Sequence, residues 1–140
     1  MAMTIEQLIE DFELLDDWEE RYQEIIDLGK QLPELPDAYK TEAYKVRGCA
    51  SQVWLVPSVT DDEPPVITFR ADSDAHIVRG LVAILLMIYS DKTAKDILNV
   101  DIQAIFNQLE LASHLSPSRS NGFQSMVKKI RAIAENAVAA

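Results

Sequence analysis

The sequence predicts an α+β fold in which a small antiparallel β-sheet is flanked by N-terminal and C-terminal helices. Apolar residues recur at helical spacing near both ends of the chain. The stretch from residue 44 to residue 70 is instead rich in β-branched and aromatic residues, with an acidic, proline-containing turn at 61–65. The length of 140 residues fits one domain, so we expect residues 1–140 to fold as a unit.

Two helices are expected before the sheet. Thr4, followed three residues later by Gln7, has the pattern of a capping box at the start of the first helix. Asp16 with Glu19 repeats this start signal for the second helix, which the LPELP run at 32–36 ends. Gly29 near the end of the second helix indicates close packing against a neighbour. Residues 37–42 predict a short helical turn.

A change in the spacing of the apolar residues, from helical spacing to strand-like runs, predicts where the strands lie. Residues 44–46 and the apolar run 53–56 favour strands, and Gly48-Cys49 is the break between them. Pro57 is expected to end the second of these strands. Residues 66–70 alternate between apolar and polar and predict a strand that pairs back as an antiparallel hairpin.

The remaining chain is expected to be helical. The ADSD run at 71–74 is predicted to cap a core helix from about Asp74 to Tyr89, which is apolar all round in its second half. Thr93 and Asp101 are predicted caps of two short helices, through Leu98 and Leu109. Ser116-Pro117 is predicted to begin the last helix, because proline suits the first helical position.

Charge is distributed unevenly along the chain. The net charge is −10, which disfavours nucleic acid as a partner because a negative surface repels phosphate. Residues 1–40 hold twelve acids and three bases, whereas 43–60 and 111–134 hold no acid. This pattern is either ordinary variation or a sign that the two acid-free stretches meet in space, forming a less negative patch around the cysteine.

Cys49 is the one cysteine of the chain, so no intrachain disulfide is possible. The first fifteen residues lack the basic and apolar regions of a secretory signal. The longest apolar run, residues 81–89, is too short for the roughly 20 residues that span a bilayer. We therefore expect a cytoplasmic protein with no membrane association, in a compartment where a lone thiol stays reduced.

The thiol of Cys49 has two interpretations. A lone cysteine is often a small buried hydrophobic residue. The alternative is a reactive thiol, for which a nearby cation or backbone N–H groups favour the thiolate. Arg47 lies two residues before it, Gly48 allows unusual backbone angles, and Ser51 and Gln52 add hydrogen-bond donors.

Two charged residues elsewhere are candidates for the same site. Arg119 lies in the first turn of the predicted last helix, where the helix dipole disfavours a cation, so it is either a solvated side chain or one placed to meet an anion. Asp74 is predicted at the start of the core helix, where stabilisation of the helix dipole is the simpler role.

Other site chemistries have weaker support. His76 and His114 are the two histidines, and either one paired with Cys49 would suggest a cysteine hydrolase, although no signature of such an enzyme is present. No metal-ligand spacing occurs, and one cysteine is too few to hold an iron–sulfur cluster. Glycine-rich phosphate loops are also absent. The sequence therefore predicts neither a metal nor a cofactor.

Four segments resemble the SufE family, the sulfur-acceptor proteins of SufS-type cysteine desulfurases. They are RGCASQVWL (47–55), ADSDAHIVRGL (71–81), LSPSRSNG (115–122) and, in support, LGKQLPELP (28–36), in the order that the family has them. Ala50 departs from the glutamine that the family more often has next to the cysteine. This departure puts in doubt a role for a side-chain amide at that position.

The resemblance implies a fold similar to that of the IscU scaffold and a function without cofactor or stand-alone enzymatic activity. Cys49 would accept a persulfide sulfur from the desulfurase, stimulate its turnover, and deliver the sulfur to a SufBCD-type scaffold for iron–sulfur cluster assembly. Asp74 and Arg119 match positions that the family associates with the cysteine loop or the partner interface. An acceptor of a CsdE-like sulfur-transfer branch is the nearest alternative, and a purely structural adaptor is a more distant one.

Overall fold

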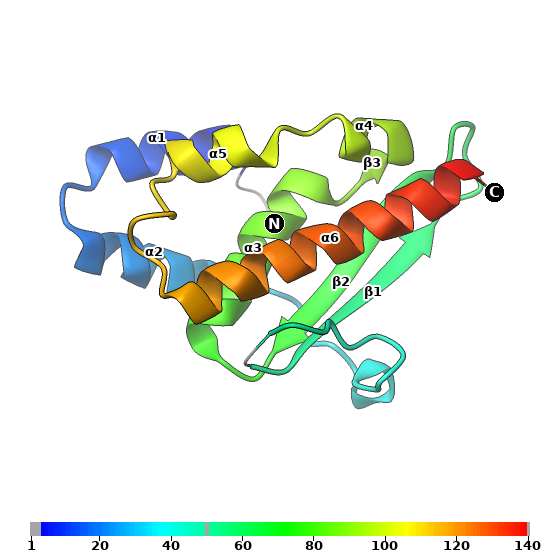
Figure 1. Cartoon of the computed structure of the whole chain (residues 1–140), viewed down its shortest axis with the longest axis horizontal. Helices are drawn as coiled ribbons and strands as arrows, with labels where there is room; N and C mark the ends of the chain where they lie inside the picture. Colours follow the sequence, from blue (N-terminus) through cyan, green and yellow to red (C-terminus); the bar gives the residue numbers. More distant parts are fainter. Residues whose placement is uncertain (1–3, 50, 140) are drawn as a thin grey trace.

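The computed structural model describes residues 4–49 and 51–139, and within them it confirms the predicted α+β fold. The described residues form six α-helices, one short 3-10 helix and an antiparallel sheet of three strands (Figure 1). In chain order the elements are α1 (Ile5–Leu14), α2 (Trp18–Lys30), η1 (Asp37–Tyr39), β1 (Val53–Val59), β2 (Val66–Ser73), α3 (His76–Tyr89), β3 (Lys92–Thr93), α4 (Ala94–Leu98), α5 (Ile102–Gln108) and α6 (Pro117–Ala139).

Most predicted helix starts are confirmed, because local capping chemistry decides them. Thr4 and Gln7 form the capping box of α1 in both directions. Thr93 and Asp101 accept hydrogen bonds at the starts of α4 and α5, and α6 begins at Pro117. The predicted Asp16 start of α2 is wrong by one residue. Asp17, which directly precedes Trp18, accepts the hydrogen bond from the Glu19 backbone N–H instead.

The sheet has the order β1-β2-β3, and β1 and β2 form the predicted hairpin. The prediction that Pro57 ends β1 is wrong, because the strand continues to Val59 with Pro57 opposite Phe69. β1 is an edge strand, where a proline is tolerated because its missing N–H removes no bond to the partner strand. Residues 44–46 form an isolated bridge at Lys45 rather than a full strand. The two-residue strand β3 was not predicted.

The ADSD run does not cap a helix. Residues 71–73 are instead the end of β2, with Ser73 opposite Val53. α3 begins at His76 after Ala75, which makes no side-chain cap. The physical reason is that the Asp72 carboxylate forms ion pairs with Lys40 and Arg79 and is not available to cap a helix. The Asp72 backbone lies opposite Trp54 in the hairpin, so β2 continues to Ser73.

α3 and α6 pack on the same face of the hairpin. Val53, Leu55 and Ala71 of the sheet surround a small internal space together with Val82 and Leu85 of α3 and Met126 and Ile130 of α6. Figure 1 shows α6, coloured orange to red, running along the hairpin toward the C-terminus. The loop that precedes β1 contacts α6 through Cys49, whose Sγ lies 3.5 Å from the backbone oxygen of Gly122.

The other side of α3 packs against α2 at close range, as the glycine in α2 predicts. A Cβ atom on Gly80 would lie 2.0 Å from the backbone oxygen of Ile25, and one on Gly29 would lie 2.6 Å from the backbone nitrogen of Gly80. The two backbones therefore touch where these glycines cross. Among the residues that the structure describes, no helix has both the length and the apolar character needed to cross a bilayer.

Candidate functional site

Cys49 lies in the loop between the Lys45 bridge and β1, at the place where the sequence predicts a break. Gly48 before it has a φ of 88°, which favours glycine. A Cβ atom on Gly48 would also lie 2.4 Å from Ser125 Oγ of α6. The positive φ is the reason for glycine here, and the short distance shows that the loop lies directly against α6. Ala50, the departure from the family pattern, lies outside the described residues.

The Cys49 thiol points at α6 rather than away from the molecule. It is half-buried, and Sγ lies 3.5 Å from the backbone oxygen of Gly122, to which the thiol donates a hydrogen bond. Burial raises the pKa of the Cys49 thiol above its ordinary value. A carbonyl acceptor acts in the same direction, because it favours the protonated form. The resting thiol is therefore mostly protonated at neutral pH.

A small pocket of about 30 Å³ adjoins the sulfur atom. A water-sized sphere needs roughly 10–15 Å³, so this space has room for one or two atoms. Apolar side chains from α3 and α6 make up four of the nine lining residues, and the other five come from the cysteine loop and the first part of α6. The lining consists of Cys49, Ser51, Val78, Leu81, Ser118, Arg119, Gly122, Phe123 and Met126.

Arg47 does not supply the cation that the sequence suggests beside the thiol. Its guanidinium forms an ion pair with Glu42, Nη2 to Oε2 at 2.8 Å, and both side chains are exposed. The pKa of the Cys49 thiol is correspondingly raised by burial and not lowered by a neighbouring charge. The expectation that Arg47 stabilises a thiolate in the resting state is therefore wrong.

Arg119 is close to the thiol, although the two residues lie far apart in the sequence. It lies in the first turn of α6, as predicted, and its backbone N–H donates to Ser116 Oγ at 3.2 Å. Arg119 is one of the residues that line the pocket next to Cys49, and it is otherwise exposed. Contact with the cysteine loop and contact with a partner protein both stay predictions for the Arg119 side chain.

Asp74 holds the end of the cysteine loop that leads into β1. Its Oδ1 accepts a hydrogen bond from the Gln52 N–H at 3.1 Å, and its own N–H donates to the Gln52 carbonyl at 3.2 Å. Asp74 directly precedes Ala75, the N-cap of α3, and is therefore not within the helix, so its role in stabilising the dipole of α3 stays a prediction. Gln52 takes part in this pairing through its backbone.

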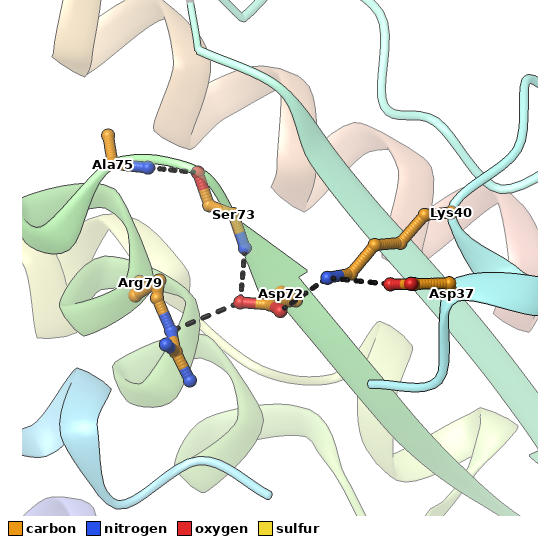
Figure 2. Close-up of polar contacts among 6 residues, drawn as sticks. All are labelled: Asp37, Lys40, Asp72, Ser73, Ala75 and Arg79. Atoms are coloured by element: carbon orange, nitrogen blue, oxygen red, sulfur yellow. Dashed lines mark hydrogen bonds and ion pairs between the residues drawn. The ribbon is translucent and has the colours of Figure 1, made fainter. Parts of the chain in front are cut away.

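Asp72 connects the end of β2 to α3 and to Lys40, a role that the sequence did not indicate. Figure 2 shows its nearly buried carboxylate between Arg79 and Lys40. Oδ1 lies 3.1 Å from Arg79 Nε in an ion pair without hydrogen-bond alignment, and Oδ2 lies 3.5 Å from Lys40 Nζ. Ser73 N–H donates to Oδ1 at 2.7 Å. The network joins β2, α3 and the segment that leads into the cysteine loop.

The two acid-free stretches meet in space, as the second interpretation of the charge pattern predicts. Gly48 and Cys49 of the first stretch contact Ser125 and Gly122 of the second. The signal for this contact was present in the sequence as an isolated glycine, Gly122, in an otherwise helical segment. Sequence spacing alone did not indicate that it lies under the thiol.

The histidines do not complete a hydrolase-like pair in the described part of the chain. The His114 ring stacks on Trp18 with centroids 3.8 Å apart, and its Nδ1 lies 3.1 Å from the Glu110 carbonyl oxygen. Neither His114 nor His76 lines the pocket at the sulfur, where the Gly122 carbonyl is the partner of the thiol. Across residues 4–49 and 51–139, no group of three potential metal ligands is found.

Comparison with known proteins identifies relatives over nearly the whole chain. A family model described as "SufE: Fe-S metabolism associated domain" matches residues 6–134. An uncharacterized SufE-like protein of Rhizobium meliloti is 52% identical over 133 residues, which cover 94% of this chain and 95% of the relative. An uncharacterized SufE-like protein of Rhizobium etli is 54% identical over 129 residues, covering 91% of this chain and 87% of the relative.

The fold also matches a solved structure. The solution structure of a hypothetical protein from Thermus thermophilus superimposes with a TM-score of 0.76 at 17% identity. The match covers 99% of this chain and 100% of the other. At this identity the match shows a shared fold alone.

Proposed function

The chain belongs to the SufE family of Fe–S metabolism, and on that premise we propose that Cys49 accepts sulfur from the persulfide of a SufS-type cysteine desulfurase. The observation that carries the proposal is the single thiol of the chain, placed on a family-matched loop against a pocket of one or two atoms. We treat residues 1–140 as one SufE-like domain that performs this step without metal or cofactor.

The transfer step is a displacement at sulfur, chemically akin to thiol–disulfide exchange. The Cys49 thiolate attacks the terminal sulfur of the donor's cysteine persulfide. A new S–S bond forms on Cys49 while the S–S bond of the donor breaks, and the donor cysteine leaves as a thiolate. No oxidant or reductant is consumed, because the sulfur carries its oxidation state with it.

The surroundings of the thiol fit a carrier that is unreactive at rest. A raised pKa lowers the thiolate fraction and so slows attack by Cys49 on unintended disulfides. The small pocket offers space for the added sulfur beside Val78, Leu81, Phe123 and Met126, away from small thiols in solution. Shelter of this kind lengthens the lifetime of the persulfide between donor and recipient.

Sulfur transfer to a protein partner requires the thiol to leave this position. We propose that the loop 47–52 holds Cys49 inward in the free protein and turns it outward when the desulfurase docks. The paired hydrogen bonds between Asp74 and Gln52 then form the fixed end of the moving loop. Amide hydrogen exchange tests this motion. Faster exchange at 47–52 with bound desulfurase supports it, whereas equal protection in both states contradicts it.

After accepting sulfur, Cys49 delivers it to a SufBCD-type scaffold for iron–sulfur cluster assembly. Removal of the persulfide also frees the desulfurase cysteine, which stimulates turnover of that enzyme. A desulfurase of a CsdE-like branch is the alternative donor. Parallel assays with both desulfurase types distinguish the two, since the true donor transfers sulfur faster at equal concentration.

The experiment that tests the carrier role compares wild type with Cys49→Ser. Each protein is incubated with a SufS-type desulfurase and cysteine, and its intact mass is measured under non-reducing conditions. We expect one or more added sulfur atoms on wild type and none on the variant. Added sulfur on the variant would show that Cys49 is not the acceptor.

A further inference from the structure

A shallow, positively charged hollow lies next to the cysteine loop. It measures about 310 Å³, and we call it the basic hollow; it is lined by Lys45, Val46, Arg47, Ser125, Lys128 and Lys129. Lys128 and Lys129 are exposed on α6, and Lys45 and Arg47 come from the segment before Cys49. Among the described residues the three lysines form no ion pair, and Arg47 pairs with the exposed Glu42.

The hollow is lined by cations although the chain as a whole is acidic. The chain has a net charge of −10, and each cation of the hollow lies in one of the two stretches without acids, 43–60 and 111–134. The three lysines that line the hollow form no ion pair among the described residues and repel one another, so the site is stabilised when a negative group occupies it. A locally positive surface on an acidic protein therefore selects a partner with an acidic segment.

The basic hollow lies next to the site of the thiol, on the same loop and the same helix. Ser125, which lines the hollow, lies against Gly48. Gly122, one helical turn earlier on α6, accepts the hydrogen bond from Cys49. A protein segment bound in the hollow is thus held within one helical turn of the reacting sulfur, in contact with the base of the loop that carries it.

We infer that the basic hollow docks an acidic surface segment of the protein that donates sulfur to Cys49. This inference rests on the proposed function, and it adds where the donor binds and by which charge. A protein segment fits better than a nucleic acid, because a long polyanion would also meet the acid-rich remainder of the surface.

The donor is a better occupant than the recipient of the sulfur. The donor meets the resting protein, in which the thiol is turned toward α6 and its pKa is raised. Contacts beside Arg47 and Ser125 supply binding energy at the base of the loop, where it is needed to move the thiol. The recipient instead meets a loop that already carries its sulfur.

The test is the rate of persulfide formation on three charge variants of the full chain, with a SufS-type desulfurase and cysteine. K128E/K129E reverses two charges in the hollow. K128R/K129R keeps them. K30E/K95E makes the same change in net charge at exposed positions outside the hollow. Each protein is also alkylated with iodoacetamide, which reports whether the thiol itself is altered.

We expect K128E/K129E to form persulfide at least about tenfold more slowly at low salt, with the difference falling below about twofold at 0.5 M salt, since screening removes charge steering. K128R/K129R and K30E/K95E are expected within about twofold of wild type. Equal rates for all variants, or equal slowing by K30E/K95E, would overturn the docking site.

Two further outcomes separate this inference from the function on which it rests. Normal uptake but slowed delivery of sulfur by K128E/K129E would overturn the assignment to the donor and give the hollow to the recipient. Failure of wild type to take up sulfur would refute the proposed function and the docking site with it. Slower sulfur uptake by K128E/K129E, with normal uptake by wild type and by the other two variants, supports the docking site.

Discussion

Gly122→Ala is the change that examines the pocket beside the thiol with the least disturbance elsewhere. Gly122 lies inside α6, and a Cβ atom at this position would lie 3.5 Å from Cys49 Sγ and 3.8 Å from Cys49 Cα. These are ordinary van der Waals distances, so the resting thiol tolerates the added methyl group. The methyl group nevertheless occupies space next to the sulfur, where the pocket measures about 30 Å³.

The expected effects on stability and on the persulfide have opposite signs. Alanine within a helix is favoured over glycine by about 0.5–1 kcal/mol, so the folded protein gains stability. The added sulfur of the persulfide, however, now competes with the methyl group for room. Overfilling a packed site costs about 1–3 kcal/mol, and 1.4 kcal/mol corresponds to a tenfold change in population. The sheltered persulfide is therefore expected to be at least about fivefold less populated.

The assay is the half-life of the Cys49 persulfide in the presence of a small thiol, followed by mass spectrometry. We expect a shorter half-life in Gly122→Ala by about fivefold or more, together with an unchanged or higher midpoint of urea unfolding. Asn121→Ala is the matched control, because it replaces the exposed neighbouring helix residue and leaves the pocket lining intact. An unchanged half-life in Gly122→Ala would refute the idea that the pocket shelters the sulfur.

Three further predictions concern stability and pH. Asp72→Asn leaves Arg79 and Lys40 without their shared carboxylate. Because both cations are partly exposed, the change is expected to lower the free energy of unfolding in urea by about 2 kcal/mol. The control Asp37→Asn removes the exposed partner of Lys40 and is expected to change stability by less than about 0.5 kcal/mol. Equal losses in both would contradict a structural role for the Asp72 network. Gly80→Ala places a Cβ atom 2.0 Å from the Ile25 oxygen and is expected to destabilise by about 3 kcal/mol or more; a smaller loss on calorimetry would mean that the helices separate easily. Because burial raises the pKa of the Cys49 thiol, its stabilising contribution is complete below the pKa of the unfolded thiol, about 8.5, and is lost as the pH rises toward the higher folded value. The stability of wild type relative to Cys49→Ala should therefore fall above about pH 8.5, and a constant difference from about pH 7 to 10 would contradict the burial.

Local signals explain why much of the fold could be predicted. The capping residues Thr4, Thr93 and Asp101, and proline at the start of α6, act within one turn of the helix that they begin. The hairpin of β1 and β2 likewise follows from alternation around a turn. These features depend on neighbours in sequence, which the sequence displays directly.

The errors concern residues whose structure is decided by distant partners. The ADSD run has the pattern of a helix cap, yet Asp72 binds Arg79 and Lys40, so that β2 continues through Ser73. Pro57 has the pattern of a strand end, yet it is accommodated because β1 lies at the edge of the sheet. Tertiary contacts outweighed local preference in both places.

The candidate site shows the same division. The sequence indicates Cys49 and its glycine, and it places Arg119 in the first turn of the last helix. The direction of the thiol toward Gly122, and the pairing of Arg47 with Glu42 instead of the thiol, depend on how α6 packs beneath the loop. The bonds between Asp74 and Gln52 depend on the hairpin register. None of these can be derived from spacing along the chain.

The central claim is that Cys49 carries sulfur, and peptide-level mass spectrometry tests it most directly. The protein is incubated with a SufS-type desulfurase and cysteine, alkylated to trap persulfides, and cleaved with trypsin after Arg47 and Arg70. The resulting peptide 48–70 contains the one cysteine of the chain. We predict that this peptide gains sulfur while the desulfurase turns over. Continued turnover with no sulfur added to the peptide would contradict the claim.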